Sequence, residues 1–78
     1  MPVNGGNGDN GRMDIQLNGE TRGIPEQATL ATLLAHEGLA ERRVAVEVNG
    51  GIVPRGRHAT HVLRPGDAVE IVHALGGG

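Results

Sequence analysis

The chain has 78 residues, a formal net charge of -2, no cysteine and no Phe, Tyr or Trp. A domain of this size buries only about 60% of the surface of its unfolded chain, and ligand pockets usually occupy about 300–1,000 Å³, so we expect an interaction module or a carrier and no enzyme. The missing cysteines exclude disulfides and thiolate sites, and the missing aromatic residues and basic stretch argue against nucleic-acid binding.

The first twelve residues, MPVNGGNGDNGR, hold almost nothing to bury. Their richness in glycine and asparagine is typical of disorder, so residues 1–12 are interpreted as a disordered extension. They have no apolar region of a secretory signal, and no apolar run in the chain approaches the length of a membrane span. We therefore expect a cytoplasmic protein that makes no membrane contact, with a domain that begins at Met13.

Residues 13–25 predict a β-hairpin. Met13, Ile15 and Leu17 alternate with polar residues, which is typical of a half-buried strand. Asn18-Gly19 is a strong short-range signal for a hairpin turn. The return strand is expected to stop at the proline that ends this segment.

Residues 29–39, TLATLLAHEGL, predict a short helix with a signal at each end. Thr29 is the expected N-cap, and the leucines at positions 30, 33 and 34 form one apolar stripe. Gly38 suits the left-handed position after the helix, and Leu39 is expected to pack back on the last turn. Because so short a helix is marginal alone, we expect it to lie on the apolar face of a sheet.

Residues 44–54 predict a strand, a turn and a short strand. Val44, Val46 and Val48 share one face, and residues 49–51, Asn-Gly-Gly, are expected to turn the chain. Pro54 lacks the N–H that a sheet ladder needs and is expected to end the run.

Residues 55–67 are expected to be irregular, with Val62 and Leu63 in the core and a type II turn at Pro65-Gly66. Arg55 and Arg57 are interpreted as solvated side chains. The histidines at positions 58 and 61 are three apart but have no evident third ligand. We therefore expect no metal site.

The last strand is expected from Ala68 onward. Val69 and Ile71 point inward, while Val72 and Ala74 lie on the outward face. A strand that is apolar on both sides is typically central in its sheet. The pattern as a whole predicts an α+β fold in ββαββ order, with one main helix packed on one face of a sheet.

Three motifs together resemble one family. They are VNGGIVPR (Val48 to Arg55), LRPGDAVEI (Leu63 to Ile71) and HALGGG (His73 to Gly78). The chain from Met13 to Gly78 resembles the ThiS family, the β-grasp, ubiquitin-like sulfur carriers of thiamine biosynthesis. The resemblance implies a mixed sheet in which the final strand lies parallel beside the first. It implies a β-grasp domain over residues 13–75 and a flexible glycine tail over residues 76–78.

The resemblance also implies a chemistry. A ThiF-type adenylating enzyme would use ATP to adenylate the carboxylate of Gly78, and a persulfide sulfur donor would convert the adenylate to a thiocarboxylate. A ThiG-type thiazole synthase would then receive the sulfur for the thiazole ring of thiamine. The carrier itself would bind no cofactor or metal and would have no catalytic residue. Gly76 and Gly77 have no Cβ, so they are expected to thread into the partner.

Docking is expected beside the tail. Val72, Ala74 and Leu75 are the candidate docking residues, because the sheet face opposite the helix is open in this architecture. Leu75 has a second interpretation, in which it closes the edge of the core.

Three alternative functions stay open at this point. The first is a sulfur carrier for molybdopterin or cysteine synthesis, which would share the tail. The second is a ubiquitin-like tag; since the chain has no lysine, such a tag would form no lysine-linked chains. The third is a β-grasp interaction domain whose terminal glycines are inert.

Overall fold

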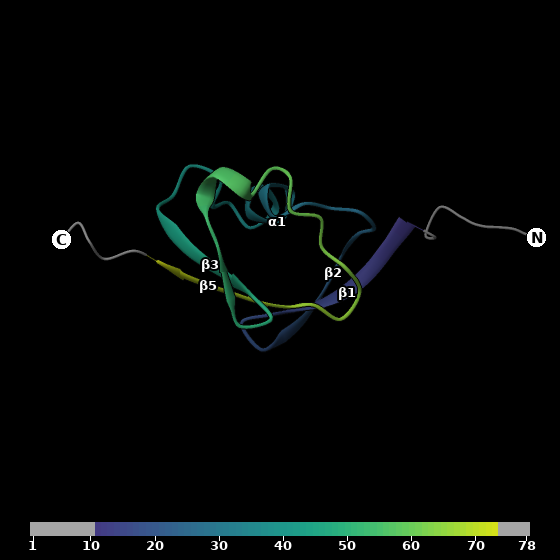
Figure 1. The fold of residues 1–78 in the computed structure, drawn as a ribbon. Helices are drawn as coiled ribbons and strands as arrows, with labels where there is room; N and C mark the ends of the chain where they lie inside the picture. Colours follow the sequence, from purple (N-terminus) through teal and green to yellow (C-terminus); the bar gives the residue numbers. More distant parts are fainter. Residues whose placement is uncertain (1–10, 74–78) are drawn as a thin grey trace, which may run out of the picture.

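The structure is a computed structural model that describes residues 11–73. The expectations for residues 1–10 and for residues 74–78 lie outside the described residues. The elements in chain order are β1 (Arg12–Leu17), β2 (Glu20–Pro25), α1 (Leu30–His36), β3 (Val44–Val48), β4 (Gly51–Val53), a 3₁₀ helix (Arg55–Arg57) and β5 (Ala68–His73). Figure 1 shows α1 lying across one face of the sheet. The first strand begins one residue before the expected start of the domain.

The sheet has the strand order β2-β1-β5-β3-β4. β5 is therefore central, as its two apolar sides predicted, and it runs parallel to β1 and antiparallel to β3. The α+β class, the mixed sheet and the single covering helix are confirmed. The short strand expected within residues 44–54 forms as the three-residue β4; the ββαββ order left it uncounted, and with it the order is ββαβββ.

Both Asn-Gly turns form as left-handed pairs. Asn18 and Gly19 have φ values of 50° and 85°, and Asn49 and Gly50 have 53° and 86°. Two consecutive residues with positive φ are the mark of the type I′ turn, whose twist matches that of a hairpin. Gly51 already belongs to β4, so the second turn is one residue shorter than expected.

The ends of α1 are capped as the sequence predicted. The Thr29 hydroxyl accepts a hydrogen bond from the Thr32 N–H at 3.2 Å. At the other end, Gly38 adopts a φ of 77°, and the Leu39 N–H donates to the Leu34 carbonyl at 2.7 Å. This is the 6→1 bond of a Schellman motif, and it brings the half-buried Leu39 against the core.

The core lies between α1 and the sheet. Its most deeply buried side chains come from the helix, from three strands and from the loop before β5: Ile15, Leu30, Leu33, Val46, Leu63 and Val69. Leu63 is buried as expected, but the expectation for Val62 is wrong, since its side chain is 50% exposed. Val62 forms a β-bridge with Thr29, and successive side chains of an extended segment point to opposite sides. Only one of the two neighbours is therefore able to enter the core.

Candidate functional site

The candidate site is the end of β5, the strand that leads into the terminal residues. Only the first part of β5 lies beside β1, where Gln16 pairs with Ala68 and Leu17 with Val69. Beyond that point β5 is held by Asn18, whose side-chain oxygen accepts a hydrogen bond from the Ile71 N–H at 2.8 Å. The side chain of a turn residue thus extends the contact along β5 after the strand pairing with β1 has ended.

β3 fixes the other side of β5 along nearly its whole length. The antiparallel register runs from Val48 opposite Val69 to Val44 opposite His73. The last described residue is therefore still within a strand pair. The sheet therefore holds the backbone of β5 as far as His73.

The two faces of β5 differ sharply in exposure. Val69 and Ile71 face α1 and are 1% and 9% exposed, whereas Val72 faces away from the helix and is 57% exposed. The structure thus places Val72 on the open face, as the sequence predicted. The other residues expected to dock or to thread, Ala74, Leu75, Gly76 and Gly77, lie outside the described residues, and so does Gly78.

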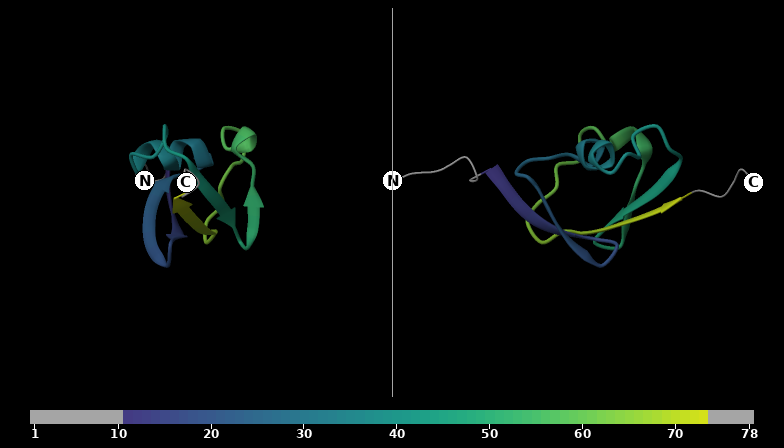
Figure 2. Two further views of the ribbon diagram at one scale, coloured as in Figure 1. Left: turned by 90° about the vertical axis from the view of Figure 1, so that its left-hand side faces the viewer. Right: turned by 180° about the vertical axis from the view of Figure 1, so that it is seen from behind.

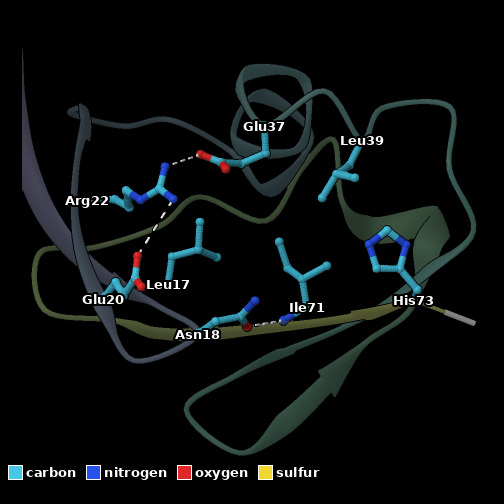
Figure 3. A pocket seen from close by; sticks show the side chains of 8 residues that line it. All are labelled: Leu17, Asn18, Glu20, Arg22, Glu37, Leu39, Ile71 and His73. Atoms are coloured by element: carbon cyan, nitrogen blue, oxygen red, sulfur yellow. Dashed lines mark hydrogen bonds and ion pairs between the residues drawn. The ribbon is translucent and has the colours of Figure 1, made fainter.

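On the helix side, the end of β5 borders a hollow of about 240 Å³. Figure 3 shows the side chains that line it: Leu17, Asn18, Glu20, Arg22, Glu37, Leu39, Ile71 and His73. The Arg22 guanidinium lies 2.9 Å from the Glu37 carboxylate and 3.9 Å from that of Glu20. Because these groups are partly exposed, the pairs contribute little to stability.

Sequence reasoning missed this hollow. The hollow lies beyond the end of α1 at His36, beside the exposed His73 at the end of β5. Two features of the sequence could have indicated the hollow. A seven-residue helix spans only about 10 Å at 1.5 Å per residue. Arg22 also stands at a position of β2 that faces the helix.

The histidines of the 3₁₀ region do not form a paired site. The His58 ring is buried, and its Nε2 lies 3.0 Å from the Val53 carbonyl oxygen, which makes this side chain part of the core. His61 is only half-buried. Within residues 11–73, no three His, Cys, Asp or Glu side chains are grouped closely enough to hold a metal ion.

The helix content also bears on membranes. Among the residues that the structure describes, no helix has both the length and the apolar character needed to cross a bilayer.

Comparison with known proteins decides the family. Residues 15–78 match the model of the ThiS family. The chain belongs to the ThiS family. The crystal structure of the thiamine biosynthesis protein ThiS from Geobacter metallireducens is 30% identical, with a TM-score of 0.74, over 85% of this chain and all of that one. The β-grasp fold expected from the ThiS resemblance is thereby confirmed.

Curated relatives include longer chains. A thiazole synthase of Magnetococcus marinus is 44% identical over 66 residues, and one of Paramagnetospirillum magneticum is 41% identical over the same length. In both cases the match covers 85% of this chain but spans only a fifth (20%) of the relative. The uncharacterized protein ycf40 of Porphyra purpurea is 36% identical over 69 residues, which are 88% of this chain and 97% of that protein.

Proposed function

We propose that this ThiS-family chain is a cytoplasmic sulfur carrier for the thiazole ring of thiamine, with the carboxylate of Gly78 as the carrying group. The observation that carries the proposal is the family match over residues 15–78, which includes nearly all of the β-grasp domain and the terminal glycines. The carrier is a co-substrate and not an enzyme, and it binds no cofactor of its own.

The proposed reaction has three steps. A Gly78 carboxylate oxygen attacks the α-phosphorus of ATP on a ThiF-type enzyme, and pyrophosphate leaves. The terminal sulfur of a persulfide donor then attacks the carbonyl carbon, and AMP leaves. A thiol reduces the S–S bond of the resulting acyl disulfide, which releases the thiocarboxylate. The carrier has only to present its terminus in an extended form.

The terminal residues suit this task. Gly76 and Gly77 carry no Cβ, so they are able to pass a narrow channel and to adopt backbone conformations that other residues avoid. Val72, Ala74 and Leu75 dock on the partner while the glycines thread into it. Val72 supports this role by its exposure, since a valine buried in the core would have no surface to offer.

A ThiG-type thiazole synthase is the proposed sulfur acceptor. Support comes from the two relatives named thiazole synthase, in which a segment similar to this chain makes up a fifth of a longer polypeptide. Such an arrangement would keep a carrier next to the enzyme that consumes its sulfur.

The test is mass spectrometry of the C-terminal peptide. The chain is incubated with ATP, a persulfide donor and a ThiF-type enzyme that is known to act on its own carrier. We expect one oxygen of Gly78 to be replaced by sulfur. A variant that lacks Gly77 and Gly78 should keep its circular dichroism spectrum and acquire no sulfur. An unmodified Gly78 would refute the carrier function and leave an interaction domain.

A further inference from the structure

The sheet face away from α1 carries exposed aliphatic and acidic side chains near the end of β5. In Figure 2 this face is the lower side of the sheet, opposite the helix. The register places Ile52, Glu47 and Glu70 in one row across three strands. Ala45 and Val72 form the next row toward the end of β5. We call these five residues the open-face patch.

The apolar members of the open-face patch are unusually exposed for their size. Ile52 is 72% and Val72 is 57% exposed. No helix or strand within residues 11–73 covers this face. The two side chains lie in neighbouring rows on this uncovered face, so both are available for contact with a partner.

The two carboxylates of the patch face each other directly. Glu47 lies opposite Glu70 in the antiparallel register, where Cβ atoms are about 5 Å apart and like charges are unfavourable. In the described part of the chain, neither glutamate forms an ion pair. The ion pairs found there join Arg22 to Glu20 and Glu37 on the helix side of the sheet. The pair does not stabilise the free domain, and a cation from outside would relieve the repulsion.

We propose that the open-face patch docks a protein surface that places an arginine or lysine between the two carboxylates and aliphatic side chains against Ile52 and Val72. The two carboxylates favour a cationic side chain by charge complementarity, and Ile52 and Val72 favour aliphatic side chains beside that cation on the partner. The identity of the partner, the adenylating enzyme that acts on Gly78, rests on the proposed function. Six residues follow Val72 up to Gly78, and six residues in an extended chain would reach at most about 20 Å, enough to enter an enzyme docked on the patch.

The experiment compares two double variants that change the net charge equally. E47Q/E70Q removes both carboxylates of the patch. E26Q/E41Q removes two exposed carboxylates outside it. For each chain, binding to the ThiF-type enzyme is measured by calorimetry at two salt concentrations, adenylation of Gly78 is followed kinetically, and the melting temperature is recorded.

We expect E47Q/E70Q to raise Kd and the KM for the carrier about tenfold, the effect of losing one good charge pair. Its kcat should be unchanged, because the carboxylates do not touch the reacting atoms. Its affinity should also depend less on salt. The free variant should melt at a higher temperature than the unsubstituted chain, since the repulsion is gone. E26Q/E41Q should match the unsubstituted chain in Kd and KM.

The outcomes separate the two proposals. If Gly78 is adenylated and both double variants have the same KM, the docking proposal is wrong and the proposed function stands. If the enzyme binds E47Q/E70Q more weakly but leaves Gly78 unmodified in every chain, the docking proposal stands and the proposed function is wrong. If the enzyme neither binds nor modifies the unsubstituted chain, both are refuted.

Discussion

At the scale of single residues, His58 shows how a polar side chain becomes part of a small core. Its ring is 6% exposed and bonds the Val53 carbonyl oxygen. A buried hydrogen bond of this kind adds only modestly to the free energy of unfolding. Removing one partner lowers that free energy by more, because the other polar group is then buried without a hydrogen bond. His58 therefore ties the 3₁₀ region to the end of β4.

We expect His58→Ala to lower the free energy of unfolding by about 2 kcal/mol, because it leaves a carbonyl without its partner and a cavity beside it. His73→Ala is the matched control, since His73 is exposed on β5, and it should change stability by less than about 0.5 kcal/mol. Urea unfolding followed by far-UV circular dichroism measures both. Equal midpoints for the two variants would contradict the structural role of His58.

The burial of His58 was not foreseen from the sequence. A histidine at the end of a short 3₁₀ helix has no local pattern that sets its exposure, which depends on where the Val53 carbonyl lies in the folded chain. The prediction that Val62 is buried was wrong for a related reason. The direction of its side chain follows from a β-bridge to Thr29, which is distant in the sequence. Leu30, Leu33 and Leu34 were predicted correctly because helical spacing alone puts them on one face.

At the scale of elements, α1 depends on its caps because it is only seven residues long. Thr29→Ala removes the hydroxyl that accepts from the Thr32 N–H. We expect a loss of about 1 kcal/mol in unfolding free energy. Thr60→Ala is the control, because the Thr60 hydroxyl donates to the exposed Arg57 carbonyl at the long distance of 3.3 Å, and it should be close to neutral. Thermal melts of the two variants compare them, and equal losses would refute the importance of the cap.

The elements could be predicted where their signals are local. Each Asn-Gly pair sets a left-handed turn by its own chemistry, and Gly38 does the same at the helix end. The order of the strands is different, because no local pattern shows that β5 inserts between β1 and β3. The two apolar sides of β5 predicted only that it is central. The parallel pairing with β1 came from the family resemblance.

At the scale of the whole molecule, the sheet packs on the core with one face and exposes the open-face patch on the other. The strand that joins them is β5, which is fixed by β3 along one side and by β1 and Asn18 along the other. The sequence predicted Val72 on the open face, but only the strand register brings Ile52 and the Glu47–Glu70 pair into one patch with it. Residues from three strands form one surface that no single segment reveals.

Two neighbouring residues of β5 test this division between the faces. Val72→Asp places a charge on the open face, where the side chain is 57% exposed, and Ile71→Asp places one in the core, where it is 9% exposed. We expect Val72→Asp to keep the melting temperature within a few degrees but to weaken adenylation of Gly78 at least tenfold. We expect Ile71→Asp to unfold the domain, because burying an unpaired charge in an apolar core costs far more free energy than the stability of a small domain.

Circular dichroism melts and the adenylation assay on the same samples separate the two effects. If Val72→Asp also unfolds the chain, Val72 is a structural residue and docking has to be sought elsewhere; if it folds and is adenylated normally, the enzyme does not contact this face.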